Sequence, residues 1–335
     1  MSNYYCKYIS EENKDEWEEL VANNIAGGFH QSFAWAKFKQ LDGWDTYKIG
    51  LWNNDNKLIG GAILYEFTFK NASNFFYIPE GPIIPYKEDK HVLGDILMKE
   101  IIKTTDKATT HLRVEPRIET FPKVIFDDFE KAPINLQPRY TQIINLEKDV
   151  EDIKKEMKSK CRYNIKVAEK HNIEVSIENM SQDNLKRFYA LYKETFTRSN
   201  FEGKKFQLFE NLANSCKHIA KLYFAKKDGQ DLAAAIIIYF ADRSTYLYGG
   251  SSNQGRKYMP TYLLHWKIME DAKINRFKEY DMWGVAPASS KENHSWKGIS
   301  EFKMKFGGEQ KVFIGAFDYV LQEEAYRLFL QKHEI

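Results

Sequence analysis

Apolar and polar positions follow one pattern in both halves of the chain. Apolar residues dominate residues 57–65 and 75–79 in the first half, and residues 231–240 and 245–248 in the second. Short apolar runs bounded by turn residues are typical of β-strands. The pattern therefore predicts a pair of strands joined by a turn in each half.

A helix and a further strand follow each strand pair. Residues 91–104 and 260–275 carry apolar side chains three and four positions apart, which indicates amphipathic helices. Strands are predicted next at residues 111–115 and 279–283. Because the two copies lie about 170 residues apart, duplication of one α/β unit is favoured. The alternative is that two unrelated α/β domains share this common order of elements.

A strand pair followed by a helix and a strand is the core of the mixed sheet found in acetyltransferases. The 335 residues of the chain exceed one typical core, so two domains are expected. The predicted fold class is α/β, with a mixed sheet in each of two tandem acetyltransferase-like (GNAT) domains. A helix predicted at residues 323–331 is expected to cap the first domain.

Residues 150–172, between the two halves, are predicted to form one amphipathic basic helix. This segment holds seven lysines and arginines against four acidic residues. Its apolar residues recur at helical spacing, at Ile153, Met157, Cys161, Ile165 and Ala168. Two interpretations stay open, a solvated face and a contact with a phosphate backbone.

Composition limits the classes of function. A net charge of +2 gives no global field for nucleic acid, so any phosphate site is local. Three widely spaced cysteines and eight isolated histidines argue against a disulfide scaffold or a metal site. A polar N-terminus and the lack of a long apolar run predict a cytoplasmic chain without signal peptide or transmembrane segment. Peripheral contact with the inner membrane face stays open.

Candidate chemistry lies at residues 298–308, beyond the end of the last predicted strand of the second half. Lys303 and Lys305 stand there among aromatic residues and paired glycines. A lysine in an apolar pocket can hold positive charge against a developing oxyanion, as acyl transfer requires. A surface loop with solvated lysines is the alternative.

The loop at residues 252–260 takes the place of the coenzyme A pyrophosphate loop of acetyltransferases. Such a loop brings backbone N–H groups close to phosphate. Here Lys257 and the bulky Tyr258 follow Gly255, which makes a close approach unfavourable. This loop therefore argues against coenzyme A as the acyl donor.

Seven segments, in order along residues 4–320, resemble the Fem (FemABX) family of peptidoglycan bridge-forming aminoacyltransferases. They are residues 29–39 (FHQSFAWAKFK), 77–82 (YIPEGP), 112–116 (LRVEP), 160–169 (KCRYNIKVAE), 246–251 (YLYGGS), 280–284 (YDMWG) and 302–308 (FKMKFGG). The resemblance implies two GNAT-like domains, at residues 1–145 with 317–335 for precursor binding and 146–316 for the transfer centre. No inserted segment is long enough for the helical tRNA arm of some members, so the chain resembles the compact FemX-like type.

The resemblance also implies the reaction and its partners. An amino acid would pass from aminoacyl-tRNA to the stem-peptide side-chain amine of UDP-MurNAc-pentapeptide or its lipid-linked form, lipid II. No cofactor is implied, and a monomer is expected. The rival interpretations are a coenzyme A-dependent N-acyltransferase and a non-catalytic protein that binds cell-wall precursors.

Catalytic residues follow from the resemblance position by position. Phe302 and Lys303 match the pair at the transfer centre, Glu115 matches a carboxylate that faces the acceptor, and Tyr248 matches a tyrosine near the reacting groups. We expect Lys303 to stabilise the tetrahedral intermediate and Glu115 to orient or deprotonate the acceptor amine. The alternative for Tyr248 is a strand aromatic, and that for Glu115 is an ion-pair partner.

Substrate-binding residues follow in the same way. Lys39 matches a lysine that holds nucleotide phosphates, and the candidates beside it are Lys204, Arg113 and Lys37. Two departures affect the acceptor end. Lys204 and Leu208 replace an Arg and a Tyr of the family, so a point charge stands in place of a bidentate fork. Pro85 replaces a frequent Asp after the Gly-Pro turn.

Overall fold

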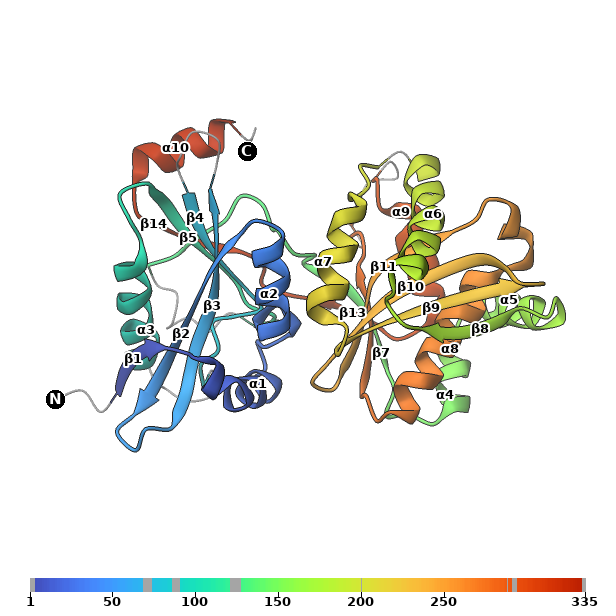
Figure 1. Cartoon of the computed structure of the whole chain (residues 1–335), viewed down its shortest axis with the longest axis horizontal. Helices are drawn as coiled ribbons and strands as arrows, with labels where there is room; N and C mark the ends of the chain where they lie inside the picture. The colour runs from blue at the N-terminus through green and yellow to red at the C-terminus, as the bar shows by residue number, and fades with distance from the viewer. Residues whose placement is uncertain are drawn as a thin grey trace. The chain divides into compact units, whose positions relative to one another are not determined.

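The computed structural model of the chain describes residues 4–68, 74–85, 91–120, 128–199, 201–287, 289–290 and 294–332. The chain divides into unit 1, Met1–Arg139 with Val312–Ile335, and unit 2, Tyr140–Lys311 (Figure 1). These limits differ from the expected 1–145 and 146–316. Strand β7 (Tyr140–Asn145) pairs with β12 (Glu279–Gly284) of unit 2, which moves the first boundary toward the N-terminus.

Unit 1 contains a seven-stranded sheet in the order β1-β2-β3-β4-β5-β14-β6. Its strands are β1 (Tyr4–Tyr8), β2 (Asp45–Asn53), β3 (Leu58–Thr68), β4 (Asn74–Pro79), β5 (Thr109–Glu115), β6 (Glu130–Lys131) and β14 (Phe317–Val320). Its helices are α1 (Lys14–Ala22), α2 (Phe33–Leu41), α3 (His91–Thr104) and α10 (Glu323–Lys332). Strands β4 and β5 run parallel, and the other paired neighbours run antiparallel.

Unit 2 contains a second seven-stranded sheet in the order β13-β7-β12-β11-β10-β9-β8. Its other strands are β8 (Glu174–Glu178), β9 (Ala220–Lys227), β10 (Gln230–Phe240), β11 (Arg243–Ser251), β12 (Glu279–Gly284) and β13 (Glu309–Val312). Its helices are α4 (Val150–Glu156), α5 (Ser159–Lys170), α6 (Gln182–Ser199), α7 (Phe206–Cys216), α8 (Pro260–Ile274) and α9 (Lys297–Lys303).

The predicted repeat is present in both sheets. In unit 1, the antiparallel pair β3–β4 is followed by α3 and by β5 parallel to β4. In unit 2, the pair β10–β11 is followed by α8 and by β12 parallel to β11. The two mixed sheets confirm the predicted fold class.

The segment predicted as one helix at residues 150–172 forms two helices instead, α4 and α5. Met157 and Lys158 between them have extended backbone angles. The Lys158 N–H donates to the carbonyl oxygen of Lys305 at 3.0 Å, so this N–H is not available to an uninterrupted helix. Arg162 donates to the carbonyl oxygen of Met157 and so satisfies an acceptor at the break.

The apolar residues that suggested this helix are nevertheless buried as expected. Ile153, Met157, Cys161, Ile165 and Ala168 belong to one core cluster with residues of α8 and the sheet. Both short helices therefore present an apolar side to the core of unit 2, and their charged side faces outward. The prediction was right about which residues face the core and wrong that the segment forms one continuous helix.

Helix α10 caps unit 1, as predicted. Its Tyr326 side chain is buried, and the Tyr326 hydroxyl donates to Asp318 of β14 at 2.7 Å. Within the described ranges, none of the helices combines the length and apolar character needed to cross a membrane.

Candidate functional site

Lys303 is the last residue of α9, a short helix that carries part of the sequence predicted to hold the chemistry. Only 6% of the Lys303 side chain is exposed. Its Nζ donates to the carbonyl oxygen of Gly284 at 2.7 Å, and Gly284 ends strand β12. The expected alternative of a solvated surface loop is therefore wrong for this lysine.

The sheet opens where Lys303 is anchored. Strands β11 and β12 are in register only from Arg243 to Thr245, opposite Glu279 to Asp281. Beyond these pairs, β11 continues to Ser251 and β12 to Gly284. Carboxyl ends of parallel strands are the usual position for ligand contacts in α/β sheets. Lys303 thus lies beside the carboxyl end of β12, beyond the last residues that pair β11 with β12.

Burial sets the electrostatics of the Lys303 ammonium. Desolvation lowers the pKa of Lys303 to about 8, while the nearby Asp281 carboxylate opposes the shift. Asp281 itself accepts hydrogen bonds from the Thr141 hydroxyl and from the Trp283 N–H. At neutral pH the lysine therefore remains mostly protonated although its surroundings are apolar.

His265 on α8 adds no second positive charge beside Lys303. Its ring is buried, and burial followed by the Lys303 charge lowers the pKa of His265 to about 3. Nδ1 of His265 lies 2.7 Å from the Tyr280 hydroxyl. A neutral imidazole in this position leaves Lys303 as the cation of the cluster.

Aromatic rings surround the lysine. Nζ of Lys303 lies 5.7 Å from the ring centroid of Tyr246, within cation–π range. The Tyr246 ring packs edge-on against His265 at 4.6 Å, and His265 packs against Phe302 at 5.4 Å. A Cβ atom on Gly249 would lie 2.1 Å from the Tyr246 hydroxyl, so glycine there leaves room for this ring.

The structure thus places Phe302, Lys303 and Tyr246 around one cluster. Sequence reasoning named Tyr248 and missed Tyr246, although both stand in the same short motif. Tyr248 packs edge-on against Phe209 of α7 at 5.2 Å. A bulge in β11 at Leu247, between these two tyrosines, breaks the alternation that would have related them. No single-sequence signal reveals such a bulge.

Glu115 ends strand β5 in unit 1 and is 5% exposed. Its Oε2 accepts hydrogen bonds from the Tyr77 hydroxyl at 2.5 Å and from the Gln137 N–H at 3.1 Å. Its buried Oε1 has no hydrogen-bond partner among the residues that the structure describes. Burial raises the pKa of Glu115 to about 7, against the lowering effect of these hydrogen bonds. The carboxyl group can therefore exchange a proton near neutral pH.

Arg113 is fully buried in the same strand. Its Nε and Nη2 donate to the two carboxylate oxygens of Asp318 at 2.7 and 2.6 Å. This bidentate pair joins β5 to β14, the strand that the C-terminal segment adds to unit 1. The arrangement gives Arg113 a structural part rather than the substrate contact that we expected.

The candidate phosphate-binding lysines lie nearer the surface. Lys39 of α2 is 3.1 Å from Asp42, and its Nζ lies 4.4 Å from the ring centroid of Trp44. Lys37 on the same helix is exposed. Lys204 of unit 2 is also exposed, and its backbone N–H donates to the Tyr192 hydroxyl at 3.1 Å.

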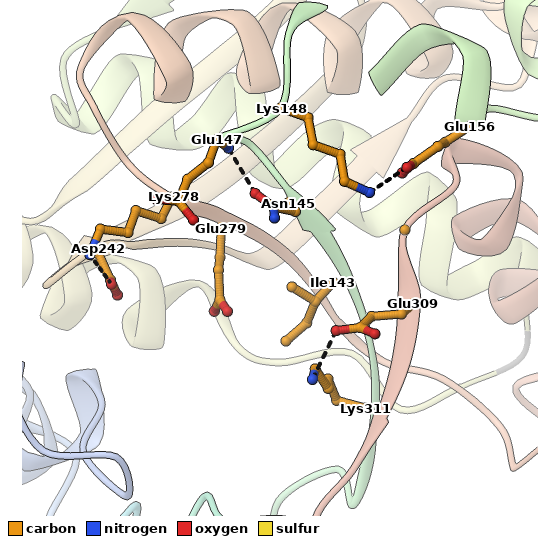
Figure 2. A pocket seen from close by; sticks show the side chains of 11 residues that line it. Ile143, Asn145, Glu147, Lys148, Glu156, Asp242, Lys278, Glu279, Glu309 and Lys311 are labelled. Carbon is orange, nitrogen blue, oxygen red and sulfur yellow. Dashed lines mark hydrogen bonds and ion pairs between the residues drawn. The ribbon is translucent and has the colours of Figure 1, made fainter. Parts of the chain in front are cut away.

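A hollow of about 530 Å³ lies elsewhere in unit 2, beside β7 and β13 (Figure 2). Its three lysines each contact a carboxylate: Lys148 pairs with Glu156, Lys278 with Asp242 and Lys311 with Glu309. None of the expected site residues lines this hollow. We assign no chemistry to it.

Comparison with known proteins gives the chain its relatives. The FemAB family model matches residues 12–120, 127–231 and 221–331. A lipid II:glycine glycyltransferase from Staphylococcus aureus (strain MRSA252) is 22% identical over 406 residues, which cover 94% of this chain and 93% of that protein. A protein of the same name from Staphylococcus haemolyticus (strain JCSC1435) is 23% identical, with the same coverage.

Solved structures show the same fold. A crystal structure of FemX superimposes with a TM-score of 0.85 at 21% identity, covering 96% of this chain and 99% of that one. A tandem GNAT protein from the clavulanic acid biosynthesis pathway gives a TM-score of 0.54 at 10% identity, covering 94% and 97%. The expected resemblance and the tandem GNAT-like fold are both confirmed, and the chain belongs to the FemAB family.

Proposed function

We propose that this chain transfers an amino acid from aminoacyl-tRNA to the side-chain amine of a peptidoglycan stem peptide. The acceptor is UDP-MurNAc-pentapeptide or lipid II. Membership of the FemAB family and relatives named lipid II:glycine glycyltransferase support this reaction class. The observation that carries the proposal is the buried, mostly protonated Lys303 beside Gly284.

The reaction is aminolysis of an ester. The acceptor amine forms a C–N bond with the aminoacyl carbonyl carbon, the ester C–O bond breaks, and the terminal ribose hydroxyl of the tRNA leaves. The acceptor ammonium first loses one proton, which Glu115 takes up, and so becomes the attacking amine. A second proton leaves the nitrogen as the amide forms and reaches the leaving ribose oxygen. The carbonyl oxygen carries negative charge in between, and a preformed cation in a dry pocket stabilises that charge strongly. In this proposal Lys303 is that cation, and no cofactor takes part.

Phe302 has a supporting role in the proposal. Phe302 packs on His265 and Tyr262 at ring distances of 5.4 and 5.2 Å, which excludes water around the lysine. A low local dielectric strengthens the interaction of Lys303 with an oxyanion. Tyr248 is retained as a candidate for contact with the reacting groups.

Glu115 is proposed to contact the acceptor amine. The observations that support this role all come from unit 1. A carboxylate oxygen without a hydrogen-bond partner can accept from an ammonium group. A pKa of about 7 lets Glu115 take up a proton from that amine under physiological conditions. Lys39 and Lys37 in unit 1 and Lys204 in unit 2 are proposed to contact phosphates, as point charges.

A transfer assay tests this function. Purified protein is incubated with a mixture of charged tRNAs and UDP-MurNAc-pentapeptide, or with lipid II, and the products are weighed by mass spectrometry. We expect an acceptor heavier by one aminoacyl residue, and the mass increment identifies the amino acid. If both acceptors stay unchanged while acetyl-CoA is consumed on an amine, the chain is a plain N-acyltransferase and the proposal is wrong.

A further inference from the structure

The outward side of α5 carries positive charge that the rest of the structure leaves unbalanced. The helix contains Lys160, Arg162, Lys166 and Lys170 against the single carboxylate of Glu169. Its net charge is thus +3, whereas the whole chain carries only +2. The excess of positive charge is therefore local to α5. The small net charge of the chain predicts that any phosphate site is local in this way.

The orientation of this helix fixes which residues face outward. Cys161, Asn164, Ile165 and Ala168 are buried, the three apolar ones in the core cluster that includes α8. On the other side, four residues follow one stripe at intervals of three and four, at Lys160, Tyr163, Lys166 and Lys170. Residues at this spacing are neighbours on a helix surface. We call these four residues the basic stripe, and all four are exposed.

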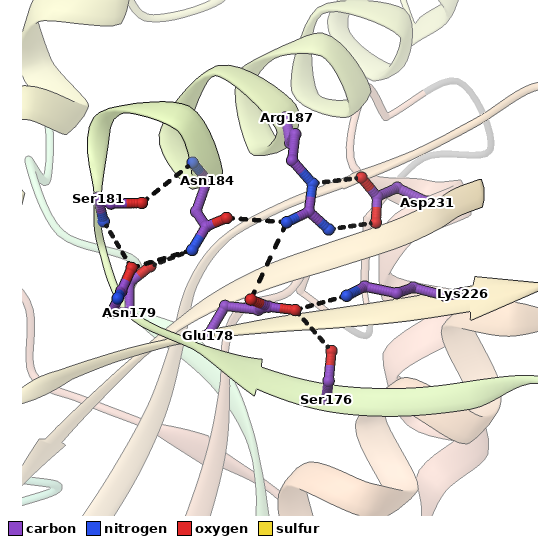
Figure 3. Close-up of polar contacts among 8 residues, drawn as sticks. All are labelled: Ser176, Glu178, Asn179, Ser181, Asn184, Arg187, Lys226 and Asp231. Atoms are coloured by element: carbon purple, nitrogen blue, oxygen red, sulfur yellow. Dashed lines mark hydrogen bonds and ion pairs between the residues drawn. The ribbon is translucent and has the colours of Figure 1, made fainter. Parts of the chain in front are cut away.

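Several other cations of unit 2 have carboxylate partners. On α4, Lys154 contacts Glu151 at 3.3 Å and Lys155 contacts Asp152 at 2.8 Å. Figure 3 shows a second example beside β8, where Arg187 and Lys226 bind carboxylates of neighbouring elements.

The lysines of the basic stripe differ from these. Across the described part of the chain, their ammonium groups make no hydrogen bond and no ion pair. Lys166 and Lys170 are moreover four residues apart, a spacing at which like charges destabilise a helix by about 0.2–0.5 kcal/mol. A polyanionic ligand would remove this repulsion.

The stripe is also connected to the segment that follows Lys303. The backbone N–H of Lys158, next to α5, donates to the carbonyl oxygen of Lys305 at 3.0 Å. From Lys160 to Lys170 the helix then extends by roughly 15 Å, at about 1.5 Å per residue. The stripe therefore starts close to the proposed transfer centre and leads away from it within unit 2.

The side chains of the basic stripe favour nucleic acid over a lipid surface as the ligand. A helix that lies in a membrane interface needs a broad apolar side to insert. The apolar side of α5 is buried in the protein core. Among the four residues of the basic stripe, Tyr163 alone has an aromatic ring, and it is 67% exposed. A row of lysines around one exposed aromatic ring instead fits phosphates and a nucleobase or ribose.

We propose that the basic stripe of α5 binds the phosphate backbone of RNA. Given the proposed function, on which this assignment of the ligand rests, the RNA is the donor tRNA. Its aminoacylated end reaches Lys303, and its backbone runs along Lys160, Lys166 and Lys170. Arg162 is left out of the contact because its guanidinium donates to the carbonyl oxygen of Met157.

Binding of labelled, deacylated total tRNA to the full chain tests the proposal, with fluorescence anisotropy over a range of salt concentrations. The test variant is Lys160→Gln/Lys166→Gln/Lys170→Gln. The matched control removes two exposed lysines of α6 and the exposed lysine directly after α7, as Lys186→Gln/Lys193→Gln/Lys217→Gln. We expect the test variant to bind about tenfold or more weakly, and its log Kd to depend on log salt with a slope lower by about 2 to 3. The control variant should bind like the native chain.

Two further measurements separate the possible failures. In transfer assays the test variant should raise KM for charged tRNA and leave kcat unchanged. Unchanged tRNA binding by this variant, or no tRNA binding by the native chain, overturns the inference. Loss of binding to phosphatidylglycerol vesicles with tRNA binding intact would also overturn it and assign the stripe to a membrane. A native chain that binds tRNA through the stripe but transfers nothing would refute the proposed function and leave the stripe assignment standing.

Discussion

At the scale of single residues, Lys303 is kept charged in a place that disfavours charge. A buried ammonium is destabilising unless it is compensated, and one hydrogen bond to Gly284 with a neighbouring Asp281 compensates it only in part. The lowered pKa of Lys303 measures the remaining penalty. Ionisable groups with a strongly shifted pKa are typical of active sites, where the charge takes part in the reaction.

Replacing Lys303 with methionine should therefore stabilise the protein. The folded pKa of about 8 lies below the ordinary value of 10.5, so the folded state loses this proton first as the pH rises. The penalty is complete below about pH 8 and disappears as the pH approaches 10.5. For Lys303→Met we expect the free energy of unfolding at pH 7 to rise by up to about 3 kcal/mol. Urea denaturation at pH 7 and at pH 10 checks this, and an equal gain at both values would contradict it.

Glu115 and Lys303 together predict how transfer depends on pH. The folded pKa of Glu115, about 7, lies above its usual 4.5, so its carboxylate is lost as the pH falls through 7. Lys303 loses its positive charge as the pH rises through 8. We expect kcat/KM to be highest between these values and to fall on both sides. In Glu115→Gln the acid-side fall should disappear along with most of the activity. A profile with the same acid limb in this variant would assign that limb to another group, such as the substrate amine.

At the scale of elements, the C-terminal strand is held to unit 1 by a buried ion pair. Arg113 of β5 and Asp318 of β14 are both fully buried, and each of the two carboxylate oxygens receives a guanidinium hydrogen bond. The Tyr326 hydroxyl of α10 adds a third hydrogen bond to Asp318. This network attaches the final two elements of the chain to the sheet.

Asp318→Ala should remove this attachment and leave a buried guanidinium without a counter-charge. Breaking one side of a buried pair typically destabilises by about 3–5 kcal/mol. We expect a loss of this size in the free energy of unfolding, measured by urea denaturation. The double variant Arg113→Met/Asp318→Leu removes both charges and should be clearly more stable than Asp318→Ala. Equal stability of the two variants would show that the pair itself contributes little.

The elements also show where sequence reasoning succeeds and where it stops. Apolar spacing identified β3, β4, β10, β11, α3 and α8, because these elements place their apolar side chains in the cores of the two units. It failed at the break between α4 and α5, where the backbone N–H of Lys158 binds Lys305, about 150 residues further along the chain. A contact so distant in sequence leaves no periodic signal.

For the whole molecule, the order of motifs was enough to identify the family and the tandem fold. Lys303 was found because its motif is specific, whereas its burial and its bond to Gly284 depend on how α9 packs. Tyr246 was missed because a bulge decides which tyrosine lies beside the lysine. Arg113 was assigned to substrate because its partner, Asp318, lies some 200 residues away in the sequence.

The central claim is that the Lys303 ammonium stabilises the oxyanion formed during aminoacyl transfer. The most direct measurement is kcat of Lys303→Met with charged tRNA and the acceptor that the native chain uses, after denaturation has shown the variant to be folded. We predict a fall in kcat of about 100- to 1,000-fold, the size of losing one oxyanion donor, with KM for both substrates changed little. A folded Lys303→Met protein that transfers amino acids at the native rate would contradict the account.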